Sequence, residues 1–193
     1  MARFLDQSEP VVVLVGMVIP GESIDGDVLV LVEQERTVAA PAELREFLLY
    51  ISTPRLRSQA LERVSSEGGT PDDLDVLIAS GRARELPIGD PVSQLSALAG
   101  LRLMPMGHPV HVSEPEGEVV WVGHTPESTA LLPISSVAAA LMWEAEDQED
   151  IPATVERLRR SHEAALEQVA RLSLGDLDGL LGNHLARLEL VSS

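Results

Sequence analysis

The chain has 193 residues, of which 45% are hydrophobic and 3% aromatic, and its formal net charge at pH 7 is −17. The chain has 14 Arg, no Lys and no Cys, which excludes disulfides, thiolate metal ligands, a P-loop and a lysine Schiff base. The acidic charge repels phosphate and the few aromatic rings offer little surface for base stacking, so both disfavour nucleic acid as a partner.

The first half is predicted to open with a small antiparallel sheet. The apolar run Val11 to Ile19 is too short to span a bilayer, and no cleavage-like site follows it, so we expect a cytoplasmic chain without a membrane segment. Turn residues separate its valines from a second β-branched run, Val28 to Val32. From Pro41 the apolar period changes to that of an amphipathic helix.

Two more helices are predicted before the first half ends. Thr53-Pro54 begins the second helix, and Gly68-Gly69 ends it. Thr70 is a predicted N-cap with Pro71 at the first helical position, and Gly81 ends this third helix. A short strand over Ala83 to Leu86 follows. The connector 88–100 has apolar residues at helical spacing and is predicted to contain one short helix.

The second half repeats this plan. Three strands are predicted over 101–122, and a helix equivalent to the first one follows Pro133. The strongest sign of duplication is a repeated phrase. Asp73-Leu74-Asp75-Val76-Leu77-Ile78-Ala79-Ser80 returns as Asp176-Leu177-Asp178-Gly179-Leu180-Leu181-Gly182-Asn183, and both copies are placed at the start of a third helix.

The repeat predicts an α+β protein made of two tandem winged-helix-like units, each a small antiparallel sheet followed by three helices. Their boundaries are 1–87 for the first unit, 88–100 for the connector and 101–193 for the second unit. In a winged helix the third helix reads DNA, but here it begins with carboxylates in both copies, which argues against groove binding. The arginine clusters at Arg55, Arg57 and Arg63 and at Arg157, Arg159 and Arg160 are interpreted as surface ion-pair partners.

The two halves differ in length between the matched anchors. Pro41 and Pro133 are 92 residues apart, whereas Asp73 and Asp176 are 103 apart, so the second half has 11 extra residues. We assign this extra length to one long second helix over 152–172, because a heptad-like series of residues runs through it. The series is Val155, Leu158, His162, Ala165, Val169 and Leu172. Such a helix would either span its own chain or form a homodimer.

Each half resembles the PqqD-like peptide chaperones, also called RiPP recognition elements. The resemblance covers Val11 to Leu86 and, more loosely, Leu101 to Val191, and it lies in the element order and in the third-helix pattern acid-Leu-acid-x-Leu-Ile/Leu. It implies that a precursor peptide is added as a strand beside the sheet and against the third helix, for delivery to a modifying enzyme. The binding residues expected on this basis are Val28, Val30 and Val32, on a segment taken as a free edge of the sheet, and Leu74, Leu77 and Ile78 on the facing helix. Each of these residues also fits a core role.

No catalytic grouping, metal site or cofactor site is predicted. His108 and His111 are three apart on a predicted strand and therefore point to opposite faces, which disfavours a shared metal. His162 lies in the heptad-like series, where a half-buried histidine is expected, and the repeated aspartates are interpreted as first-turn acids that complement a helix dipole.

The sequence therefore favours a non-enzymatic protein that captures a peptide or partner protein, with a role as the recognition subunit of a peptide-modification system. An acidic tandem winged-helix scaffold or regulator that bridges a larger complex is the alternative, and a DNA-binding regulator comes third.

Overall fold

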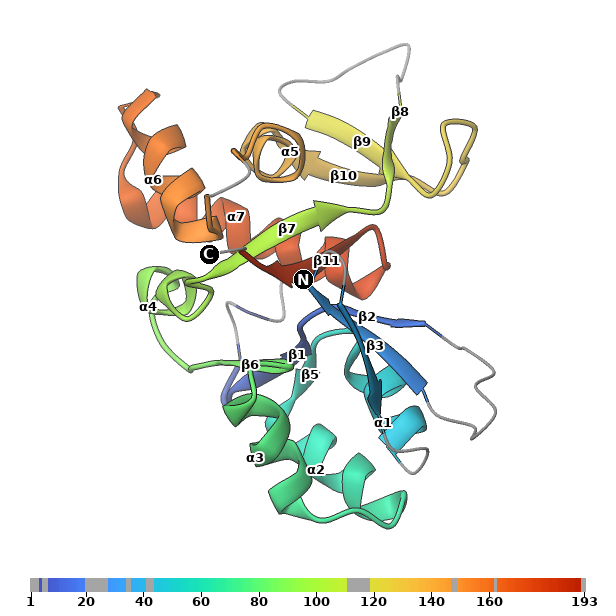
Figure 1. Cartoon of the computed structure of the whole chain (residues 1–193). Helices are drawn as coiled ribbons and strands as arrows, with labels where there is room; N and C mark the ends of the chain where they lie inside the picture. The colour runs from blue at the N-terminus through green and yellow to red at the C-terminus, as the bar shows by residue number, and fades with distance from the viewer. Residues whose placement is uncertain are drawn as a thin grey trace.

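The computed structural model describes residues 4, 7–19, 28–33, 36–40, 44–110, 119–146, 149–161 and 163–191 (Figure 1). For residues 19, 28–33, 36–40 and 45 the description covers the backbone alone. The elements of the first half are β1 (Val11–Leu14), β2 (Met17–Ile19), β3 (Val28–Glu33), β4 (Arg36–Ala40), α1 (Arg45–Ile51), β5 (Arg55–Leu56), α2 (Arg57–Ser66), α3 (Pro71–Ala79) and β6 (Ala83–Leu86). Helix α4 (Pro91–Ser96) lies in the connector, where a short helix was predicted.

The second half follows the same order, except that its described part has no counterpart of β5. Its elements are β7 (Leu101–Pro105), β8 (His108–Val110), β9 (Val119–Gly123), β10 (Leu132–Ser135), α5 (Ser136–Trp143), α6 (Ile151–Ser161), α7 (Leu166–Gly182) and β11 (Ala186–Leu190). In each half the last strand pairs antiparallel with the first, as β6 with β1 and β11 with β7. In each half three consecutive strands after the first form an antiparallel meander, β2-β3-β4 and β8-β9-β10, and in the first half a further strand, β5, pairs with β1. The α+β class is confirmed.

Strand β1 belongs to both halves, because it is buried on both faces. Val12 and Leu14 lie in a smaller core with the first-half helices, whereas Val11, Val13 and Val15 lie in the larger core of the second half. The side chains of a strand alternate between its faces, so five consecutive apolar residues serve two cores. The halves also meet through the backbone, since Gly16 N donates to Leu188 O at 2.6 Å. In Figure 1, β11 lies next to the first-half strands.

The third helix of the first half has the ends that the sequence predicts. Thr70 caps α3, its backbone N donates to Asp73 Oδ2 at 2.7 Å, and Pro71 is the first helical residue. Gly81 follows the helix with a φ of 75°, a conformation that glycine adopts without strain.

The single long helix expected over 152–172 is wrong, since two helices occupy this segment. Helix α6 ends at Ser161, and Glu163 has a left-handed φ of 51°. Ala164 N closes the end of α6 by donating to Arg159 O at 3.1 Å, and α7 begins at Leu166. The turn allows residues of both helices, Val155 and Val169 among them, to pack into the larger core.

The repeated aspartates therefore have different positions in the two helices. Asp73 lies in the first turn of α3, as predicted, but Asp176 lies ten residues after the start of α7. The expectation that both copies complement a helix dipole is wrong for the second copy. Measured from the matched aspartates, α3 and α7 end at equivalent residues, whereas α7 starts eight residues earlier, at Leu166 rather than Leu174. Most of the extra length of the second half is this extension of α7.

Candidate functional site

The strand residues expected to bind a peptide lie on the central strand of a sheet. Val28, Val30 and Val32 belong to β3, which pairs with β2 on one side and β4 on the other. The expectation that this segment is a free edge is wrong, because both flanking strands use its backbone groups. The side chains of Val28, Val30 and Val32 lie outside the described part of the structure.

The helix residues expected to face a peptide pack into the protein interior. Leu74 and Leu77 are buried in the smaller core, and Ile78 is a partly buried residue packed against it. The structure does not bring them into an open cleft, and their role in binding stays a prediction.

In the second half, the third helix packs directly against the sheet at the position equivalent to the expected peptide site of the first half. Gly179 of α7 allows Leu132 of β10 to approach so closely that a Cβ at Gly179 would lie 3.3 Å from Leu132 Cδ2. Near the end of the strand, Ser135 N donates to Asp176 Oδ2 at 2.8 Å. Asp176 thus joins α7 to the junction of β10 and α5, where Ser135 Oγ also caps α5 by accepting from Ala138 N.

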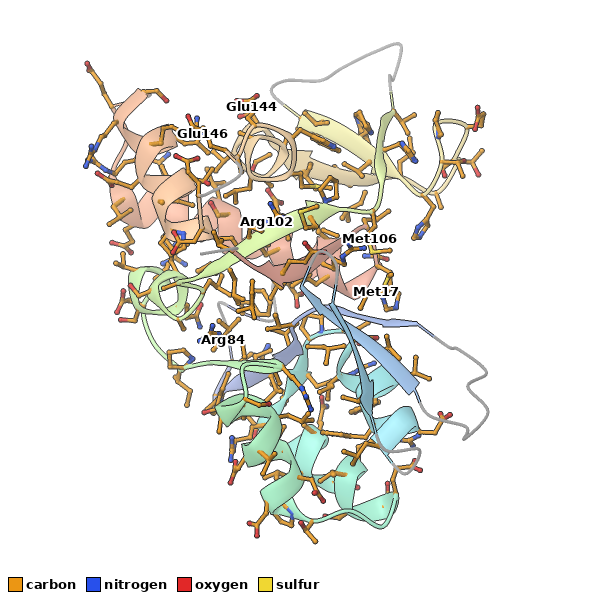
Figure 2. All side chains as sticks on the ribbon, in the orientation of Figure 1. Met17, Arg84, Arg102, Met106, Glu144 and Glu146 are labelled. Atoms are coloured by element: carbon orange, nitrogen blue, oxygen red, sulfur yellow. The ribbon has the colours of Figure 1, made fainter. Side chains whose placement is uncertain are left out.

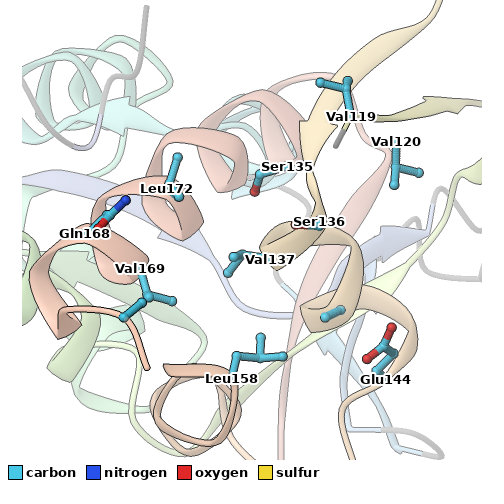
Figure 3. A pocket seen from close by; sticks show the side chains of 12 residues that line it. Val119, Val120, Ser135, Ser136, Val137, Glu144, Leu158, Gln168, Val169 and Leu172 are labelled. Carbon is cyan, nitrogen blue, oxygen red and sulfur yellow. The ribbon is translucent and has the colours of Figure 1, made fainter. Parts of the chain in front are cut away.

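A large hollow opens beyond this junction, and we call it the second-half groove. Its volume is about 830 Å³, within the range of about 300 to 1,000 Å³ usual for ligand sites. The start of β9, the end of β10, helix α5, the end of α6 and the start of α7 form its walls (Figure 3). The lining residues are Val119, Val120, Ser135, Ser136, Val137, Ala140, Glu144, Leu158, Ala164, Gln168, Val169 and Leu172.

The extension of α7 forms one wall of the groove. Gln168, Val169 and Leu172 all fall within the eight residues by which α7 exceeds α3. Val169 is buried beneath the groove, whereas Leu172 is 45% exposed at its margin. Val119 on the opposite wall is 38% exposed. The groove therefore lies where the two halves diverge. Sequence reasoning noted the extra length but assigned it to the preceding helix.

The groove is apolar with one acidic end. Eight of its twelve described lining residues are Val, Leu or Ala, and Glu144 carries the one charge among them. Glu144 is exposed and follows the last residue of α5. In Figure 3 it lies away from Gln168 and Leu172 on α7.

Arg157 joins the end of α5 to α6 through a hydrogen bond and forms an ion pair with Glu149. Arg157 Nη2 donates to the backbone oxygen of Glu144 at 3.0 Å and contacts Glu149 Oε2 at 3.1 Å. The Arg157 guanidinium lowers the pKa of the Glu149 carboxyl from its ordinary value.

The two arginine clusters form surface ion pairs, as predicted. Arg57 contacts Asp75 and Glu85, Arg63 contacts Glu67, and Arg159 and Arg160 both contact Glu156. Arg55 instead lies over the ring of Tyr50, 4.3 Å from its centre.

A buried ionic group links β7 and β11, close to the place where the two halves meet. Glu189 of β11 is fully buried and accepts from Arg102 Nη2 of β7 at 3.3 Å and from Arg187 Nε at 2.8 Å. Arg187 also approaches Met17 of β2, and both residues line a smaller hollow of about 240 Å³ between the halves. Figure 2 shows Arg102, Met106 and Met17 around this junction.

Neither a metal centre nor a membrane span is found in the part of the chain that the structure describes. Within the described ranges, no group of three or more His, Asp or Glu side chains is placed to hold a metal ion. His108 and His124 are exposed, while His111 and His162 lie outside those ranges. No described helix is long and apolar enough to cross a membrane.

Comparisons with protein-family models, with curated proteins and with solved structures found no match to this chain. Function is therefore inferred from the second-half groove and its charge.

Proposed function

We propose that this protein is a non-enzymatic binding module, built of two winged-helix-like units, which captures a segment of a peptide or partner protein in the second-half groove. A role as the recognition subunit of a peptide-modification system fits this activity. The observation that carries the proposal is an apolar groove of about 830 Å³ at the surface, with Val119 and Leu172 exposed on facing walls.

The position of the groove supports a binding role. The first-half helices pack without an extension of α3, whereas the second half has a longer third helix whose added turns line the groove. Exposed apolar side chains around a concave surface are typical of interaction sites, because binding removes them from water. At the end of β10, Ser135 N already donates to Asp176 and is therefore not available to an added strand.

Site-specific photocrosslinking tests the proposal. A photoreactive phenylalanine analogue replaces Leu172 in cells that express the chain, and in a matched experiment it replaces Val76, which is 62% exposed on α3. We expect a discrete adduct from position 172 and none from position 76. A synthetic copy of the crosslinked segment should then bind the purified chain.

The binding must also depend on the groove. The double variant Leu172→Gln with Val119→Thr keeps helix and strand propensity but removes apolar surface, and we expect it to weaken binding of the synthetic segment about tenfold. Val76→Gln is the control and should leave binding unchanged. Equal adducts from both positions would contradict the proposed function. So would an affinity for the synthetic segment that is the same in the double variant as in the unmodified chain.

A further inference from the structure

We infer that the second-half groove selects a segment in which apolar side chains lie next to an arginine or lysine, and that this cation pairs with Glu144. This inference rests on the proposed function and adds the chemistry of the partner. Its basis is the distribution of charge around the groove.

The acidic end of the groove is part of a dense run of carboxylates. Glu144, Glu146, Asp147, Glu149 and Asp150 occur within seven residues of sequence, between α5 and α6. An apolar surface bounded by one sign of charge attracts ligands of the opposite sign and speeds their association.

The neighbouring cations are already engaged within the chain. Arg157 contacts Glu149, and Arg159 and Arg160 both contact Glu156. Arg157 donates to the backbone oxygen of Glu144 and not to its carboxylate. The Glu144 carboxylate is therefore placed to accept a cation from a bound partner.

The other walls of the groove set the remaining chemistry. Val137, Leu158 and Val169 offer apolar contacts along its length, and Gln168 on α7 supplies an uncharged amide away from Glu144. Among the described lining residues there is no cation that would favour an acidic partner. A segment with apolar residues and a cation at one end matches this arrangement, whereas an acidic segment would meet the repulsion of the whole chain, whose net charge is −17.

Selection from a random-peptide library tests the inference and does not require an identified partner. The whole chain is the bait, and binders that also bind the Leu172→Gln/Val119→Thr double variant are discarded. We expect the remaining peptides to combine apolar residues with Arg or Lys. Their affinity should fall about tenfold in Glu144→Arg and should also fall as salt is added.

Two further arms complete the test. Glu62→Arg, the same charge change at an exposed position of α2, should leave affinity within about twofold. A library selected on Glu144→Arg should yield peptides with Asp or Glu in place of the cation. Groove-dependent peptides that lack a basic residue, or that bind Glu144→Arg equally well, would overturn this inference and leave the proposed function standing. A library that yields no groove-dependent peptide would overturn both.

Discussion

At the scale of single residues, the first aspartate of the repeated Asp-Leu-Asp phrase makes a different contact in each copy of the motif. Asp73 binds the backbone N of Thr70 and closes the first turn of its own helix. Asp176, its counterpart, reaches across to the backbone N of Ser135 and joins two elements that are 41 residues apart in the chain. In both copies a carboxylate satisfies a backbone donor, which accounts for the acid without a catalytic role.

Two replacements of Asp176 distinguish the contribution of its hydrogen bond from that of its charge. Asp176→Ala leaves the partly buried Ser135 N without its acceptor, and we expect the free energy of unfolding to fall by about 1 to 2 kcal/mol. Asp176→Asn retains an acceptor oxygen and should cost less than half as much. Urea denaturation measures both variants. Equal losses for the two would mean that the charge, and not the hydrogen bond, stabilises this junction.

A second residue-scale prediction concerns pH. The guanidinium groups of Arg159 and Arg160 lower the pKa of Glu156 from 4.5 to about 2. Because the folded-state pKa is lowered, the stabilisation by this cluster is fully present above pH 4.5 and is lost as the pH falls towards 2.

Carbon-detected NMR titration of the Glu156 carboxyl should show the midpoint near pH 2. In the double variant Arg159→Gln with Arg160→Gln the midpoint should move back towards 4.5, because both ion pairs are removed. A midpoint near 4.5 in the unmodified chain would show that the ion pairs do not persist in solution.

At the scale of elements, local signals predict much of the fold, but they miss the break between α6 and α7. The ends of α3 follow from Thr70, Pro71 and Gly81, because caps and turn residues act within a few positions. The break before α7 has no such signal, since the three-and-four spacing of Val155 and Leu158 continues in phase through Val169 and Leu172. Packing decides the turn there.

The same limit applies to the predicted peptide site. The β-branched run and the turn residues before it identify a strand at β3, yet they do not tell whether it lies at the edge or in the centre of its sheet. The groove was missed for a related reason. It is formed by residues from five helices and strands, and its one sequence signal was the extra length of the second half.

Two glycines of α7 test how closely this helix packs. Gly182→Ala adds a methyl group where no other atom lies within 4 Å. We therefore expect the free energy of unfolding to rise by about 0.5 kcal/mol, because Ala has the higher helix propensity. Gly179→Leu places a large side chain against Leu132, so the free energy of unfolding should fall by about 1 to 3 kcal/mol. Thermal or urea denaturation compares the two. A stabilising Gly179→Leu would mean that β10 is free to move away from α7.

At the scale of the whole molecule, the two halves have two cores that share one strand. Val12 and Leu14 pack on one side of β1, and Val11, Val13 and Val15 pack on the other. The buried Glu189 group and the bond from Gly16 to Leu188 add polar contacts at the same junction. Loss of either core exposes one apolar face of β1, so the two halves depend on each other for stability.

This sharing predicts a single unfolding transition, which Leu74→Ala can test. Leu74 is fully buried in the smaller core, and its truncation should cost about 3 kcal/mol. Both tryptophans, Trp121 and Trp143, belong to the second half and report on it by fluorescence, whereas circular dichroism reports on all helices. We expect the two transitions to coincide in the unmodified chain and to shift together in Leu74→Ala, because a cooperative molecule loses both cores at once. If the tryptophan transition stays in place while part of the dichroism signal is lost earlier, the halves unfold independently and β1 does not couple them.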